Sequence, residues 1–247
     1  MFPKLDLEAL NTPERRARGL VFVLPGIEGR SRWNRNIIRG LAAANTPYAI
    51  ELFDWTTGWR PLALFHLRSR KLQERSSYLL AEKIVAYRTE FPDAPLYLIG
   101  HSGGGAMTLL TLGRLPAGVT ATGGILFGPA VSPWFDPLPA LQHTTRGVWN
   151  FSSWGDCLFL GIGTTAFGSV DGWHFPSAGM TGFSRQIHDR VDAASVPLLR
   201  ECPYQSRYFP CWNFAGHFGY TAPQFVQQFV APLLQPLAPT DSAVNAS

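Results

Sequence analysis

The chain has 247 residues and a formal net charge of +4; 15% of its residues are charged and 46% are hydrophobic. This composition excludes a disordered protein, because it supplies enough apolar surface for a substantial core. We expect a single domain over residues 1–247, with an N-terminal arm at residues 1–18 and a flexible tail at residues 236–247.

The N-terminal segment and the cysteines indicate the compartment. Asp6 and Glu8 occupy positions where a signal peptide would be apolar, and no apolar run reaches about 18 residues, the length of a membrane span. The three cysteines fit neither a C-x-x-C redox motif nor metal-ligand spacing. We therefore expect a cytoplasmic protein without a membrane span, metal or other cofactor. The basic residues at positions 60–75 are interpreted as a solvated helix face, with an acidic ligand or a membrane surface as the alternative.

Apolar runs and helical periodicities alternate along the chain. Runs of strand length predict buried strands at residues 19–24, 48–53, 96–99, 121–127, 147–152 and 208–214. Helical spacing and stop signals predict helices at residues 33–44, 72–91, 106–112, 184–195 and 223–234. Residues 58–70 and 161–183 are expected to be loops. The alternation predicts an α/β fold with a parallel, doubly wound sheet, in which ligands bind beyond the carboxyl ends of the strands.

The most informative motif is G-H-S-G-G at residues 100–104, between an expected strand and an expected helix. It fits the G-x-S-x-G pattern of a nucleophilic serine. Ser102 would need small neighbours at so sharp a turn, and Gly100 and Gly104 provide that space. The N-terminus of the next helix would direct free N–H groups toward the serine oxygen, where an oxyanion forms in acyl transfer. The alternative is a glycine-rich turn that binds phosphate or only packs.

Two other expected strand ends carry groups that could activate this serine. Asp156 follows the strand at residues 147–152, and His217 follows the strand at residues 208–214. A serine hydroxyl is a poor nucleophile, so it needs an imidazole base that a carboxylate orients. His217 is the predicted base and Asp156 the predicted acid. The other candidates are Asp171, Asp136 and Asp192 for the acid and His174 and His188 for the base, while His101 is expected to form part of the turn.

The chain resembles the α/β-hydrolase superfamily over roughly residues 19–234. The matching segments are L-P-G-I at residues 24–27, G-H-S-G-G at 100–104, W-G-D at 154–156 and G-H-F at 216–218. The order Ser102, Asp156, His217 is the one that this superfamily uses. Many members carry His-Gly where this chain has Pro25 and Gly26.

The resemblance implies a mostly parallel sheet of about six strands with helices on both faces. It also implies an oxyanion hole made by the backbone N–H groups of Ile27 and Gly103. Large cap domains are usually inserted in the connection between the expected strands at residues 121–127 and 147–152. This connection is short here, so we expect no large cap, and smaller lids could come from the two long loops.

Aromatic residues on the expected loops predict an apolar substrate pocket that includes Trp154 and Phe218. The interpretation is a serine hydrolase of the esterase or lipase type, which cleaves a carboxylic ester through an acyl-enzyme. Its partner would be a small ester or another acyl compound; no nucleic-acid motif is present. The same residues serve thioesterases, amidases and acyltransferases, and a non-catalytic binding protein with this fold is the alternative outside the enzymes.

Overall fold

The computed structural model describes residues 5–194, 196 and 198–235, and the expected tail at residues 236–247 lies outside these residues. Its centre is a six-stranded sheet in the order β2-β1-β3-β4-β5-β6, in which all neighbouring strands are parallel. The strands are β1 Leu20–Leu24, β2 Ala49–Leu52, β3 Leu96–His101, β4 Gly123–Phe127, β5 Val148–Ser152 and β6 Leu199–Pro203. The predicted parallel sheet of six strands is confirmed.

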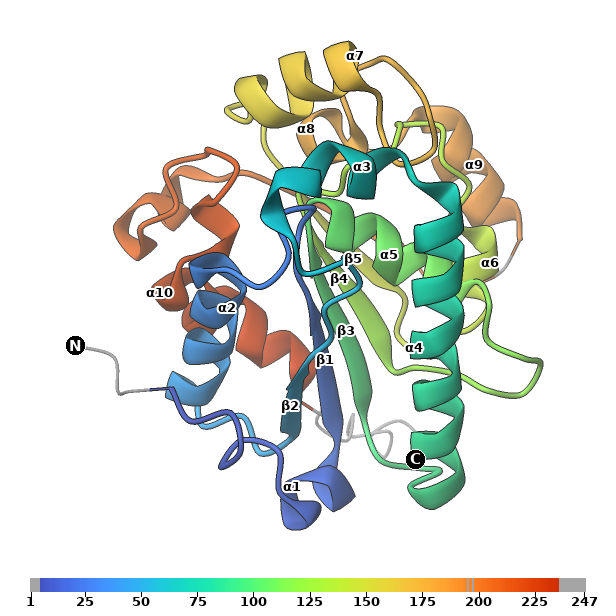
Figure 1. Cartoon of the computed structure of the whole chain (residues 1–247), viewed down its shortest axis with the longest axis vertical. Helices are drawn as coiled ribbons and strands as arrows, with labels where there is room; N and C mark the ends of the chain where they lie inside the picture. Colours follow the sequence, from blue (N-terminus) through green and yellow to red (C-terminus); the bar gives the residue numbers. More distant parts are fainter. Residues whose placement is uncertain (1–4, 195, 197, 236–247) are drawn as a thin grey trace, which may run out of the picture.

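Helices cover both faces of the sheet (Figure 1). The longer ones are α2 Arg32–Ala43, α4 Arg70–Glu90, α5 Gly103–Leu112 and α9 Arg185–Ala193, and the chain ends in a continuous helical segment of α10 Pro223–Phe225, η5 Val226–Val230 and η6 Ala231–Leu234. Short helices are α1 Pro13–Arg18, η1 Arg60–Leu62, α3 Ala63–Arg68, α6 Leu138–Leu141, η2 Cys157–Gly163, α7 Thr164–Phe167, α8 Ala178–Thr181, η3 Ser206–Cys211 and η4 Gly219–Thr221. No helix in the described part of the chain is long and apolar enough to cross a membrane.

The alternation of side chains along β1 divides the core into two layers. Leu20, Phe22 and Leu24 face a cluster formed with α4, α5, α6 and α9. Val21 and Val23 face the opposite cluster, which α2 and the C-terminal helical segment complete. Because both faces are covered, β1 is buried along its whole length, as its unbroken apolar sequence predicts.

The last strand differs from the prediction. Residues 208–214 were expected to form it, but Ser206–Cys211 is a 3-10 helix, and the edge strand is β6 at Leu199–Pro203. Arg200, Glu201 and Cys202 are only partly buried at this edge, so the strand lacks the apolar run that marks the central strands. Pro210 has no N–H to donate to a ladder, which opposes the expected strand.

The two expected loops contain short helices. Residues 58–70 hold η1 and α3. The loop expected at residues 161–183 holds the end of η2, which begins before it at Cys157, and the helices α7 and α8. Both segments lie beyond the carboxyl ends of the strands, at the top of the molecule in Figure 1. Residues 128–147, which connect β4 to β5, hold only the four-residue helix α6, so no large cap is inserted there.

Candidate active site

Ser102 forms the turn between β3 and α5. Its backbone has φ 54° and ψ −119°, a conformation that residues other than glycine rarely adopt. The Ser102 N–H donates to Phe127 O at 2.9 Å, and Ser102 O accepts from the Gly105 N–H at 2.9 Å. A third bond, from the Ala130 N–H at 3.1 Å, also ends on Ser102 O. These bonds hold the strained residue between two strands and a helix.

Two glycines make this turn sterically possible. A Cβ atom on Gly100 would meet Gly104 O, and one on Gly104 would meet the carbonyl oxygens of Leu24 and Pro25, all far inside van der Waals contact. The obstructing atoms belong to the backbone, so a side chain could not be accommodated by rotation of a neighbour. The spacing of the motif therefore follows from the close approach of α5 to the ends of β1 and β3.

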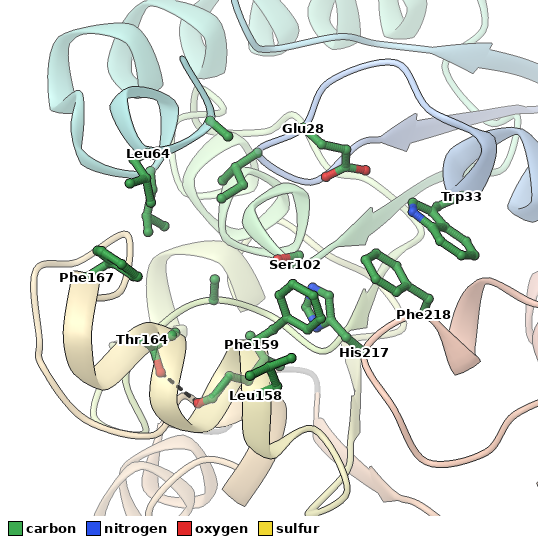
Figure 2. Close-up of a pocket in the computed structure, with 16 residues that line it drawn as sticks. Glu28, Trp33, Leu64, Ser102, Leu158, Phe159, Thr164, Phe167, His217 and Phe218 are labelled. Atoms are coloured by element: carbon green, nitrogen blue, oxygen red, sulfur yellow. Dashed lines mark hydrogen bonds between the residues drawn. The ribbon is translucent and has the colours of Figure 1, made fainter. Parts of the chain in front are cut away.

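His217 and Asp156 meet beside this turn. The Nδ1 atom of His217 is 2.5 Å from Oδ2 of Asp156, and both side chains are buried. Asp156 is fixed in addition by η2, because its Oδ1 accepts from the Leu160 N–H at 3.3 Å. The ring of Phe159 stacks on His217 with centroids 4.7 Å apart. Ser102 and His217 line one cavity, in which Figure 2 shows them next to each other.

No protein-family model matches the sequence, and a comparison with curated protein sequences finds no match. Solved structures do resemble it. A protein from Klebsiella pneumoniae assigned as a dienelactone hydrolase is 14% identical, with a TM-score of 0.55 over 86% of this chain and 85% of that one. The acylaminoacyl peptidase of Pyrococcus horikoshii is 13% identical, with a TM-score of 0.51 over 88% of this chain and 36% of that one. The chain has the α/β-hydrolase fold.

In this α/β-hydrolase fold the chain runs from β1 to β2 on one side and returns to β3 on the other, so the ends of β1 and β3 flank the point where the strand order reverses. Ile27 follows β1 there, and Gly103 starts α5. A Cβ on Gly103 would lie 3.5 Å from the Ile27 nitrogen, so the space between the two backbone segments is about the size of one methyl group. The Ile27 loop is held by Trp55 Nε1, which donates to Pro25 O at 2.7 Å, and by His66 Nδ1, 2.8 Å from Ile27 O.

The other candidate acids and bases have different partners. Asp171 accepts hydrogen bonds from the backbone and hydroxyl of Ser132, at 2.9 and 2.5 Å. His188 contacts Glu201, and His174 contacts the carbonyl of Thr165. The cavity that Ser102 lines is not lined by any of the alternative acids and bases, which are Asp136, Asp171, Asp192, His174 and His188.

His101, the variable residue of the motif, forms a hydrogen bond with the backbone of His217, the proposed base. It is 1% exposed, and its Nε2 is 3.0 Å from the carbonyl oxygen of His217. Burial, together with the charge of His217, lowers the pKa of His101 to about 3. The ring is therefore neutral at ordinary pH, with the Nε2 proton donated to His217 O and no partner on Nδ1 in the described part of the chain. This bond fixes the loop that carries His217.

The cavity has a volume of about 480 Å³ and a mostly apolar wall. Phe218 lines it, as expected, but Trp154 does not, and the Trp154 side chain is 68% exposed. The lining residues that the sequence did not single out for this site are Glu28, Trp33, Ala63, Leu64, Leu67, Ala130, Leu158, Phe159, Leu160, Gly163, Thr164 and Phe167. Most come from α3, η2 and α7, and Trp33 was assigned only to a helix face. Leu158, Phe159 and Leu160 in η2 precede the loop that was expected at residues 161–183. Residues 58–70 and 157–167, called the lid segments below, build much of the pocket wall.

Substitution of Gly100 by alanine should destabilise the protein strongly. The new Cβ would collide with backbone atoms of α5, so we expect a loss of about 2–4 kcal/mol in the free energy of unfolding. Gly216→Ala is the matched control, because a Cβ there would meet nothing within 4 Å and should change stability by less than about 0.5 kcal/mol. Urea unfolding of both variants measures the difference, and equal stabilities would contradict the steric account of the turn.

The neutral state of His101 predicts a pH dependence of stability. Its pKa of about 3 in the folded protein lies below the ordinary value of 6.5, so the unfolded chain binds the proton first as the pH falls. Above pH 6.5 the folded and unfolded chains both hold His101 neutral, and the free energy of unfolding is not reduced. Below pH 6.5 the unfolded chain takes up the proton, and the free energy of unfolding falls progressively. Between pH 8 and pH 5.5 we expect His101 to remove about 1.4 kcal/mol from the free energy of unfolding.

Urea unfolding at the two pH values, in the wild type and in His101→Gln, isolates this contribution. The variant should show a smaller decrease in stability on acidification than the wild type. An identical decrease in both proteins would show that His101 is not held neutral.

Proposed function

We propose that the protein is a serine hydrolase that cleaves carboxylic esters through Ser102, His217 and Asp156. The observation that carries this proposal is the geometry around His217. One side of its ring is bound to a buried carboxylate at 2.5 Å, and the ring lines the same cavity as a serine held at a strained strand-to-helix turn. A buried imidazole paired with a carboxylate on one nitrogen has its other nitrogen free for a proton transfer.

The reaction would begin with attack of Ser102 Oγ on the ester carbonyl carbon, while His217 Nε2 takes the hydroxyl proton. Asp156 keeps the Nδ1 proton in place and stabilises the imidazolium that forms. The oxyanion would be bound by the N–H groups of Ile27 and Gly103, whose backbone segments lie close together. His217 then gives its proton to the departing alcohol, and a water molecule, deprotonated by the same nitrogen, hydrolyses the acyl-enzyme.

The pocket supports an apolar acyl group. Leu64 of α3, Leu158 and Phe159 of η2, and Phe167 of α7 line the cavity with apolar side chains, as Figure 2 shows. A volume of about 480 Å³ lies in the range of small-molecule sites. Hydrophobic burial favours a longer acyl chain by about 0.8 kcal/mol for each methylene group that enters such a wall.

Activity should depend on Ser102. A series of p-nitrophenyl esters from acetate to palmitate, tested with the wild type and Ser102→Ala in parallel, should show turnover by the wild type only. The variant removes a single oxygen and should retain the circular dichroism spectrum and unfolding midpoint of the wild type. Full turnover by folded Ser102→Ala would refute the proposed nucleophile, and no turnover by either protein would shift the proposal to amide or thioester substrates or to a binding protein.

The carboxylate role can be tested separately. Asp156→Asn keeps an oxygen for the Leu160 N–H but changes the hydrogen bond to His217, so kcat should fall by about ten-thousandfold. Asp171→Asn is the control, because Asp171 is bound to Ser132 outside the cavity and should leave kcat within about threefold of the wild type. A large loss in Asp171→Asn with little loss in Asp156→Asn would reverse the assignment.

A further inference from the structure

Glu28 places a carboxyl group in the wall of the cavity. It follows Ile27 directly in the loop after β1, and it is the one carboxylate among the described residues that line the cavity with Ser102 and His217. Figure 2 shows its side chain on the same side of the cavity as Ser102. The proposed ester hydrolysis gives this group no role, because His217 already has its own carboxylate partner.

Local contacts hold the Glu28 carboxyl close to the nucleophile. Its Oε1 accepts from Ser31 Oγ at 3.0 Å, and Ser31 is itself fixed as the N-cap of α2. Its Oε2 lies toward the turn: a Cβ built on Gly26 would be within van der Waals radii of Oε2 and only 3.3 Å from Ser102 Cβ. In the described part of the chain, no side chain donates to Oε2 and no Arg, Lys or His forms an ion pair with Glu28.

Such a group is costly to keep unpaired. Burial raises the pKa of Glu28, although hydrogen bonds from its own backbone N–H and from Ser31, and the more distant charges of His217 and Arg60, oppose this rise. A carboxyl oxygen that faces an apolar cavity without a side-chain donor loses hydration, and since the pKa is still raised, these contacts do not make up for that loss. Its negative charge would also oppose an oxyanion at Ser102, so it is unsuited to stabilise the transition state directly. A hydrogen-bond donor on the substrate would pair with this oxygen, and a cationic donor would also neutralise its charge.

We propose that Glu28 is a specificity-determining residue, which accepts a hydrogen bond from a hydroxyl or ammonium group that the ester carries near its scissile carbonyl. This inference rests on the proposed ester hydrolysis and deepens it. The preferred substrates would combine an apolar part, bound by the lid segments, with one donor close to the reacting carbon. A site with a buried acceptor discriminates strongly against an analogue that lacks the donor, because the acceptor is then left unpaired.

Isosteric esters test this preference. On the acyl side, methyl lactate and methyl alaninate replace one methyl group of methyl isobutyrate by a hydroxyl and an ammonium group. On the alcohol side, 2-hydroxyethyl acetate is compared with propyl acetate. The ratio of kcat/KM between each donor ester and its isostere is measured by pH-stat titration, and the side that shows the preference locates the donor.

In at least one of the two comparisons, kcat/KM of the wild type should be about tenfold to a hundredfold higher for the donor ester. A hydrogen bond to a charged group accounts for a ratio of this size. Glu28→Met should abolish the preference, whereas Glu28→Gln, which keeps a carbonyl acceptor, should retain part of it for the hydroxyl and lose it for the ammonium group. Glu82→Gln removes an exposed carboxylate on α4 and should behave like the wild type.

Two results would overturn the inference alone: hydrolysis of donor esters and isosteres with equal kcat/KM by the wild type, or a preference that survives in Glu28→Met. If the wild type hydrolyses none of these esters or the p-nitrophenyl esters, the proposed function fails, and this inference fails with it.

Discussion

The backbone of Ser102 is held at φ 54° and ψ −119°, and the architecture around the site depends on that conformation. It requires α5 to begin almost in contact with the ends of β1 and β3, a distance that only Gly100 and Gly104 permit. In return, the turn presents the serine side chain to the cavity and leaves the first N–H groups of α5 outside the helix hydrogen-bond pattern. The parallel sheet makes this possible, because β4 ends beside β3 at the same edge. The Phe127 carbonyl of β4 and the N–H groups of Ala130 and of Gly105 in α5 form the hydrogen bonds that stabilise the strained residue.

Several buried polar groups at the same edge of the sheet form hydrogen bonds with one another. His217 is bound by Asp156 on one nitrogen, and its carbonyl oxygen accepts from neutral His101. Ser153 Oγ donates to Ala215 O at 2.6 Å and so ties the His217 loop to the end of β5. In a low-dielectric surrounding each of these bonds is worth more than in water, and each unpaired group costs more. The network therefore positions His217, although its loop does not directly follow a strand in the chain.

Much of this arrangement could be predicted from the sequence. Four strands, β1, β3, β4 and β5, are buried along their whole length and mostly apolar, and β2 is apolar except for Glu51. The glycine spacing around Ser102 directly reflects a steric requirement. The edge strand could not be found in this way, because β6 is half exposed and carries Arg200 and Glu201. The prediction of His217 used a strand at residues 208–214 that does not exist, yet the structure brings this residue to Asp156. Glu28 gave no sequence signal. Lids were predicted from residues 58–70 and 161–183, but not the residues that line the pocket, since a pocket wall depends on which short helices fold over the strand ends.

The central claim is that Ser102 is a nucleophile activated by His217. Labelling with a fluorophosphonate, followed by intact-protein and peptide mass spectrometry, tests it independently of the substrate. The account predicts one adduct per chain, located on Ser102, and a labelling rate that falls by about a hundredfold or more in folded His217→Gln, since a general base contributes about that much. An unlabelled Ser102 in the folded wild type, or equal labelling rates with and without the histidine, would contradict it.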